Sequence, residues 1–149
     1  MQKTYNISTI DDLKILVKDL ISDVLKPGIA LALVGDLGAG KTTFVQILAE
    51  YLGVSEDVTS PTFVLHQTYE LPNAVNEIHR IHHLDLYRLE TIQDVLELGI
   101  EELFDDNHAI VCIEWADKIA SFLPEGTVYF NFKQLEEETR LIEIISPEK

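Results

Sequence analysis

The strongest constraint in this sequence is the segment GDLGAGKT at residues 35–42, which fits the pattern G-x-x-x-x-G-K-[ST]. A β-rich apolar run at residues 29–34 precedes it, and apolar residues at helical spacing follow it to about residue 52. A strand, a glycine-rich loop and a helix in this order are typical of a phosphate-binding loop. The sequence therefore predicts a nucleotide-binding protein.

The residues of this loop have separate chemical tasks. Gly35, Gly38 and Gly40 allow backbone angles at which successive N–H groups turn inward around a phosphate. Lys41 stands at the start of the following helix, where its ammonium can reach the β- and γ-phosphates. The Thr42 hydroxyl can ligate the Mg²⁺ that bridges them. The alternative, turn glycines beside an unrelated lysine, does not account for the strand before the loop or the helix after it.

Length and composition favour one globular domain that spans residues 1–149. The chain of 149 residues has the size of one domain, and it is 46% hydrophobic without an apolar stretch long enough to cross a bilayer. Its amino terminus lacks the pattern of a secretory signal, and the lone Cys112 has no partner for a disulfide. We therefore expect a cytoplasmic protein with a buried, reduced thiol.

The charge balance limits the choice of partners. The chain has 11 basic and 26 acidic residues, a formal net charge of −15. It should repel a polyanion, and it lacks the cluster of Lys and Arg that autonomous nucleic-acid binding needs. We interpret the acidic residues at 101–102, 105–106 and 136–138 as solvated surface, with contact to a basic partner protein as the alternative.

The first third of the chain carries clear start and stop signals. A short strand is predicted at residues 4–7, and Ser8 or Thr9 can cap the helix that follows. Apolar residues recur in this helix at spacings of three and four until Pro27-Gly28 ends it. The helix after the phosphate loop is expected to close at Gly53.

The rest of the chain alternates between strands and short helices. Strand-like runs at residues 63–71 and 77–87 are predicted to pair antiparallel through the turn residues Pro72-Asn73-Ala74. The remaining expected elements are one or two short helices at 91–103 interrupted at Gly99, a buried strand at 109–115, a helical segment at 116–122, and a hairpin of strands at 127–135 and 139–146. This order predicts a three-layer α/β sandwich of the P-loop NTPase type, with a mixed, mainly parallel core sheet and antiparallel additions.

Two acidic residues end apolar strands of this sheet. Asp85 follows the run at residues 78–84, and Glu114 follows the run at 109–113. The carboxyl ends of strands in such sheets open onto the ligand crevice, so both carboxylates can face the phosphates. Neither segment has the usual Asp-Glu pair of such ATPases. The alternative is that each acid caps the next helix.

Other polar residues lie near these motifs. The segment Thr59-Ser60-Pro61-Thr62 stands where many phosphate-loop proteins keep the loop that senses the γ-phosphate, and a plain turn is the alternative. His82 and His83 precede Asp85, and a hydrogen bond from His83 to a neighbouring carboxylate or loop is favoured over a zinc site. Trp115, the one tryptophan, either belongs to the core or lies against the nucleotide.

Together these motifs resemble the TsaE family, also called YjeE, bacterial ATPases required for threonylcarbamoyl modification of tRNA. GDLGAGKTTF resembles the family's phosphate loop, TSPTF its switch I segment, HLDLYRL its H-x-D-x-Y-R switch II segment, and IEW its Glu-Trp pair. The resemblance covers most of the chain, and the last three motifs are specific in combination. The sequence departs from the commonest family form at Ala116-Asp117, where Pro-Glu is usual, and residues 71–80 also look variable.

The resemblance implies a role for each matching residue. Lys41, Glu114 and Asp85 would carry catalysis, with Glu114 as the essential acid near the γ-phosphate. Thr42, Asp85 and Glu114 would hold the metal. The nucleotide contacts would come from Asp36, Leu37, Gly38, Ala39, Gly40, Lys41, Thr42, Thr43, Thr59, Thr62 and Trp115.

The resemblance also implies ATP and Mg²⁺ as ligands, and the proteins TsaD and TsaB as partners. TsaD transfers the threonylcarbamoyl group to the adenosine beside the tRNA anticodon, and TsaB is its partner. The acidic chain would then contact tRNA only indirectly, through this complex. No membrane would be among its partners.

Two other functions compete with this one. A small-molecule kinase is disfavoured because Arg80, Arg88 and Arg140 are few arginines for clamping two phosphorylated ligands. An interaction module is the second alternative, in which ATP selects a loop conformation without productive catalysis. A GTPase is disfavoured because no N-K-x-D segment occurs. Adenine preference otherwise rests on the resemblance.

Overall fold

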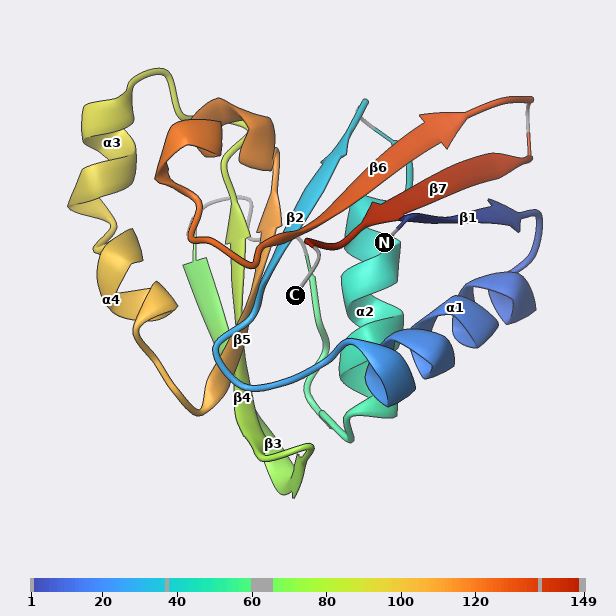
Figure 1. Cartoon of the computed structure of the whole chain (residues 1–149), viewed down its shortest axis with the longest axis horizontal. Helices are drawn as coiled ribbons and strands as arrows, with labels where there is room; N and C mark the ends of the chain where they lie inside the picture. The colour runs from blue at the N-terminus through green and yellow to red at the C-terminus, as the bar shows by residue number, and fades with distance from the viewer. Residues whose placement is uncertain (1, 37, 60–65, 137, 148–149) are drawn as a thin grey trace.

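A computed structural model describes residues 2–36, 38–59, 66–136 and 138–147. Its centre is a seven-stranded sheet in the order β1-β7-β6-β2-β5-β4-β3 (Figure 1). Strands β6, β2, β5 and β4 pair in parallel, whereas β3 joins β4, β7 joins β6 and β1 joins β7 antiparallel. The predicted mixed sheet with a parallel core is confirmed. The strands are β1 Gln2–Ile7, β2 Ala30–Gly35, β3 His66–Val75, β4 Ile78–Asp85, β5 Ala109–Glu114, β6 Val128–Gln134 and β7 Arg140–Ile145.

Helices cover both faces of the sheet. Figure 1 shows α1 and α2 on one side, and α3, α4 and the 3-10 helix η1 on the other. Their bounds are α1 Ile10–Asp23, α2 Lys41–Tyr51, α3 Ile92–Glu97, α4 Ile100–Phe104 and η1 Ala116–Phe122. A separate buried apolar cluster fills the space on each side, so the predicted three layers are confirmed. Within the described ranges, no helix combines the length and apolar character that crossing a bilayer demands.

Helix α1 begins at a capping box. The Thr9 hydroxyl accepts a hydrogen bond from the Asp12 amide at 3.2 Å, and the Asp12 carboxylate accepts from the amides of Ser8 and Thr9 at 2.9 and 3.1 Å. Of the two predicted N-cap residues, Thr9 is the one that caps α1. Further along, Gly99 has φ 70° and separates α3 from α4, which confirms the predicted interruption.

Strand β5 is buried along its whole length, as expected for a strand in the middle of a covered sheet. Cys112 lies on this strand as a free, fully buried cysteine. Burial and the charge of Glu114 raise the pKa of its thiol to about 12. The thiol is therefore protonated and inert at neutral pH, which agrees with the predicted buried, reduced state.

The turn of the β3–β4 hairpin differs from the sequence prediction. Residues 72–74 lie inside β3, in a stretch where the hairpin register shifts, and the chain reverses at Asn76-Glu77 between the paired residues Val75 and Ile78. Asn76 and Glu77 have φ values of 51° and 65°, as a type I′ turn requires. Pro72 fits the strand because β3 is an edge strand with a register shift, where a missing N–H costs little. The predicted strand residues 63–65 lie outside the described residues.

Replacing Glu77 with glycine is expected to stabilise the protein. A β-carbon is disfavoured at φ 65°, and Asn-Gly is the preferred pair for this turn. We expect the free energy of unfolding, measured with urea, to rise by about 0.5–1 kcal/mol. Asn76→Gly is the matched control and should lower it, because the Asn76 amide donates to the carbonyl oxygens of Ile21 and Leu25 at 2.8 and 3.2 Å. A loss of stability in Glu77→Gly would contradict the turn assignment.

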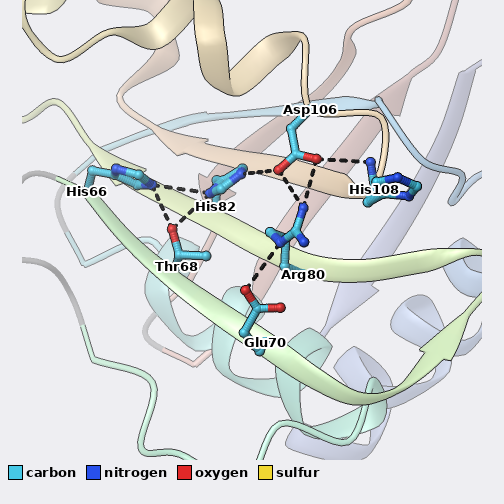
Figure 2. A network of polar contacts seen from close by, with 7 residues as sticks. All are labelled: His66, Thr68, Glu70, Arg80, His82, Asp106 and His108. Atoms are coloured by element: carbon cyan, nitrogen blue, oxygen red, sulfur yellow. Dashed lines mark hydrogen bonds and ion pairs between the residues drawn. The ribbon is translucent and has the colours of Figure 1, made fainter.

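The prediction that residues 105–106 form solvated surface is wrong for Asp106. Figure 2 shows its carboxylate surrounded by donors. Arg80 Nη1 donates to both oxygens at 2.9 Å, His82 Nε2 lies 2.8 Å from Oδ2, and the His108 amide donates to Oδ1 at 3.0 Å. The sequence did not indicate these contacts because two of the partners, Arg80 and His82, lie on β4, which is distant from Asp106 in the chain.

The network continues across the β3–β4 hairpin. On one side, Arg80 Nε donates to Glu70 at 3.2 Å. On the other, His82 Nδ1 lies 2.9 Å from the Thr68 hydroxyl and 3.3 Å from His66 Nε2 (Figure 2). These contacts fasten the edge strand β3 to β4 and to the segment that enters β5.

Asp106 gives the network a pH dependence. Partial burial alone raises its pKa, but hydrogen bonds from His82, the His108 amide and Arg80 outweigh that effect and lower the pKa to about 2. Because this folded-state pKa lies below the ordinary value of 3.8, the carboxylate stabilises the fold above about pH 4. That contribution is lost as the pH falls from about 4 to 2.

Asp106→Asn should therefore be less stable than the wild type at pH 7, and the difference should shrink by about 2 kcal/mol between pH 7 and pH 2. Urea unfolding of both proteins across this range measures the difference. Asp105→Asn, at the exposed neighbouring position, is the control and should track the wild type. A difference between Asp106→Asn and the wild type that stays constant with pH would contradict the assigned role.

Candidate nucleotide-binding site

The predicted phosphate loop lies at the carboxyl ends of the parallel core strands. Strand β2 ends at Gly35, β5 ends at Glu114 and β4 ends at Asp85. In the sheet register, Glu114 pairs with Leu33 of β2 on one side and with Asp85 on the other. Both predicted acids and the loop therefore lie at the carboxyl ends of the parallel strands, where ligands of such folds bind.

Two glycines of the loop are required by its geometry. A β-carbon added to Gly35 would lie 2.5 Å from the carbonyl oxygen of Phe132 and 2.9 Å from its Cβ, so glycine lets β2 and β6 approach this closely. Gly40 has φ 104° and precedes α2 without capping it through a side chain. The first amides of α2, which lack partners within the helix, can thus serve an anion. Leu37 lies outside the described residues.

Lys41 is buried at the centre of the site, with an exposed fraction of 4%. Its Nζ donates to the carbonyl oxygens of Gly35 and Asp36 and lies 4.2 Å from the centre of the Trp115 ring. The Trp115 ring also contacts Tyr87, with 5.1 Å between ring centroids. The sequence left the place of Trp115 open, and the structure puts it against the phosphate-loop lysine.

The surroundings of Lys41 are acidic. Burial lowers the pKa of its ammonium, and the negative charges of Glu114, Asp85, Asp117 and Asp36 oppose that effect, in decreasing order. One lysine therefore shares this region with four carboxylates. A triphosphate needs more positive charge than Lys41 alone supplies here.

Glu114 is enclosed between Thr42 and His83. The Thr42 hydroxyl donates to Oε1 at 2.8 Å and to Oε2 at 3.0 Å, and His83 Nε2 lies 2.7 Å from Oε2. Glu114 is 3% exposed and His83 is fully buried. The predicted hydrogen bond between His83 and a neighbouring carboxylate is confirmed, although the sequence did not identify Glu114 as that carboxylate.

Asp85 is half-buried, and its Oδ1 accepts a hydrogen bond from the Tyr87 amide at 3.0 Å. It does not cap the next helix, because Thr91 caps α3. Lys118, which no sequence pattern singled out, donates to the carbonyl oxygens of Tyr87 and Leu89 at 2.6 and 3.0 Å and so fastens the segment after β4 to η1.

The donor chemistry of Thr42, Asp85 and Glu114 fits a hard divalent cation, because all three supply oxygen. In the part of the chain that the structure describes, no group of three or more His, Cys, Asp or Glu side chains is arranged to hold a metal ion. Mg²⁺ generally keeps several waters and binds through one or two carboxylates and substrate phosphates.

A cavity of about 290 Å³ adjoins the loop. The loop and α2 supply part of its wall, including Gly38, Ala39, Gly40 and Thr43, and the β1–α1 connection and the β6–β7 hairpin supply the rest. Arg140 lines this cavity, and its Nη1 is buried without a hydrogen-bond partner among the described residues. Sequence reasoning named Arg140 only as one of three arginines and did not place it beside the loop.

The structure describes only the start of the predicted switch I segment. Thr59 is exposed and lines a groove with Gln46 and Glu50 of α2. Thr62 belongs to residues 60–65, which lie outside the described residues. Nucleotide contacts by Thr59 and Thr62 stay a prediction.

Known proteins match this chain along most of its length. A family model described as "Threonylcarbamoyl adenosine biosynthesis protein TsaE" matches residues 7–142. The tRNA threonylcarbamoyladenosine biosynthesis protein TsaE of Rickettsia felis is 39% identical over 128 residues, which cover 85% of this chain and 71% of that protein. The protein of the same name in Bacillus subtilis is 35% identical over 126 residues, covering 85% and 75%.

A solved structure agrees with the sequence matches. The crystal structure of YdiB from Bacillus subtilis superimposes on this chain with a TM-score of 0.76 at 29% identity, and the match covers 98% of this chain and 86% of that one. Both the sequence and the fold therefore lead to the same conclusion: the chain belongs to the TsaE family.

Proposed function

We propose that this chain is a Mg²⁺-dependent ATP hydrolase that supports a TsaD–TsaB complex in threonylcarbamoyl modification of the adenosine next to the tRNA anticodon. The convergence of Lys41, Thr42 and Glu114 at a glycine-rich loop supports ATP hydrolysis most directly. Membership of the TsaE family supports the place in tRNA modification. The net charge of −15 favours contact with tRNA through partner proteins.

Each side chain has a task in this function. The first amides of α2 and the Lys41 ammonium bind phosphate oxygens. Thr42 and Asp85 hold Mg²⁺, with Glu114 beside them. Mg²⁺, when bound, neutralises charge on the β- and γ-phosphates. Glu114 orients the water that attacks the γ-phosphate, and Trp115 keeps its ring beside Lys41.

The electrostatics of the site favour dependence on the metal. Four carboxylates act on Lys41, so a bare triphosphate meets a region with excess negative charge. The adjoining cavity, about 290 Å³, is near the lower end of ligand pockets, roughly 300 Å³. We place the nucleoside there, with Arg140 as a donor to it.

Lys41→Ala and Glu114→Gln are expected to reduce ATP turnover to a small residual rate. The first removes the cation that binds the phosphates, and the second removes the carboxylate charge at the reacting water. We expect each to lower kcat about 100-fold or more in a phosphate-release assay with purified TsaD and TsaB present. Lys133→Ala, an exposed lysine on β6, is the control and should leave turnover unchanged. Turnover that survives both site substitutions would refute these roles.

Arg140→Met is expected to weaken ATP binding about tenfold, which corresponds to about 1.4 kcal/mol. The buried Nη1 has no hydrogen-bond partner among the described residues, and a nucleotide in the cavity supplies an acceptor. Calorimetric titration with ATP and Mg²⁺ measures the dissociation constant. Lys133→Met removes the same charge from the same hairpin outside the cavity and should bind as the wild type does. Equal ATP affinity in the two variants would show that Arg140 does not contact the nucleotide.

The two alternative functions give different results in reconstituted reactions. If a non-hydrolysable ATP analogue supports repeated rounds of tRNA modification, hydrolysis is unnecessary and the chain is a nucleotide-dependent interaction module. If radiolabelled phosphate moves from ATP to a small metabolite, the chain is a kinase. Phosphate release that accompanies each round of modification supports the hydrolase.

A further inference from the structure

His83 and Glu114 form a polar contact that is sealed from solvent. The side chain of His83 is 0% exposed and that of Glu114 is 4% exposed, with 2.7 Å between Nε2 and Oε2. His83 lies on β4 two residues before Asp85, opposite Cys112 of β5 in the register. His83 and Asp85 therefore lie on the same face of the sheet, and the register places His83 two pairs before the two acids.

The contact with Glu114 identifies which ring nitrogen of His83 donates. A carboxylate accepts hydrogen bonds, so Nε2 must carry the proton that points to Glu114. Nδ1 is buried and has no hydrogen-bond partner among the described residues. The contact with Glu114 therefore makes Nε2 the donating nitrogen of His83.

This geometry determines what His83 can do. Among the described residues, Nδ1 has no hydrogen-bond partner that could take part in a proton relay. His83 acts as a fixed donor. The single Thr42 hydroxyl proton is shared between Oε1 at 2.8 Å and Oε2 at 3.0 Å, and Oε2 also accepts from His83. Oε2 therefore faces two donors and Oε1 only one, which keeps a lone-pair direction open at Oε1.

We infer that His83 is a positioning residue that locks the Glu114 carboxylate so that Oε1 is the oxygen presented to the reacting groups. This inference rests on the proposed ATP hydrolase function. It differs from a purely structural role, because a space-filling residue at this position would preserve the core but release the carboxylate. Residues that orient a site through another group typically contribute about 10–100-fold to activity or metal affinity.

Substituting His83 with glutamine or with leucine separates the effect of its hydrogen-bond donor from the effect of its side-chain volume. His83→Gln can place an amide N–H near the position of Nε2, and His83→Leu fills the space without a donor. We expect His83→Gln to keep kcat within about threefold of the wild type and His83→Leu to lose about 10–100-fold. The dissociation constant for ATP without Mg²⁺ should stay within about threefold in both, because neither variant touches the loop. A wild-type kcat in His83→Leu, or an equal loss of kcat and affinity, would overturn the inference.

The donating nitrogen can be identified without any nucleotide. Nitrogen-15 spectra of the imidazole rings in the ligand-free protein should show a proton on Nε2 of His83. The His83→Gln spectrum assigns the signal by its loss. A His83 ring without a proton on Nε2 would overturn the inference, and this measurement stands even if His83→Leu does not fold.

A double-substitution cycle tests whether His83 acts through Glu114. The variant with both His83→Leu and Glu114→Gln should be as slow as Glu114→Gln alone, whereas multiplied losses would show independent roles. The failure of the inference and of the proposed function can be told apart. If the wild type with its partners releases no phosphate, the hydrolase function fails, and His83 loses its proposed task with it. If the wild type turns over and His83→Leu equals it, only the inference fails.

Discussion

The parallel pairing of β4, β5 and β2 is the constraint on which the candidate site depends. It places Asp85 beside Glu114, and Glu114 beside the last residues of β2. The carboxyl ends of strands that are far apart in the sequence therefore lie next to one another. A slip of one residue would turn Glu114 to the opposite face of the sheet and away from Thr42. The close approach of Gly35 to Phe132 fixes β6 against the same loop. Fold and site are therefore fixed by the same register.

Much of this arrangement could be predicted because it is encoded in local patterns. The apolar runs of β2 and β5 correspond to strands covered on both faces. The start of α1 could be predicted from Thr9 and the residues next to it. The break between α3 and α4 could likewise be predicted from Gly99. The strand-end acids could be placed near the loop without knowing the strand order, because the carboxyl ends of parallel strands meet at one edge.

The features that could not be predicted depend on contacts between distant segments. Pro72-Asn73-Ala74 has the stronger local turn preference, yet the structure turns at Asn76, whose side chain binds the end of α1. Asp106 looks like solvated surface until β4 is placed beside the start of β5. Arg140 reaches the loop cavity only because the β6–β7 hairpin lies next to β2. In each case the tertiary contact decides over the local preference.

The two buried charges at the site are satisfied in different ways, and this difference suits the proposed function. Lys41 is held by backbone carbonyls and by the face of Trp115, weak contacts that a phosphate can replace. Glu114 is held by side chains from two other elements, Thr42 on α2 and His83 on β4. Because a buried charge is stable only when paired, neither group can simply be released. In the proposed function, a phosphate that binds Lys41 would take over the role of the carbonyls, while Glu114 would keep its partners and its orientation. The Lys41 ammonium would then change partners during binding without moving Glu114, the acid to which we assign the chemistry.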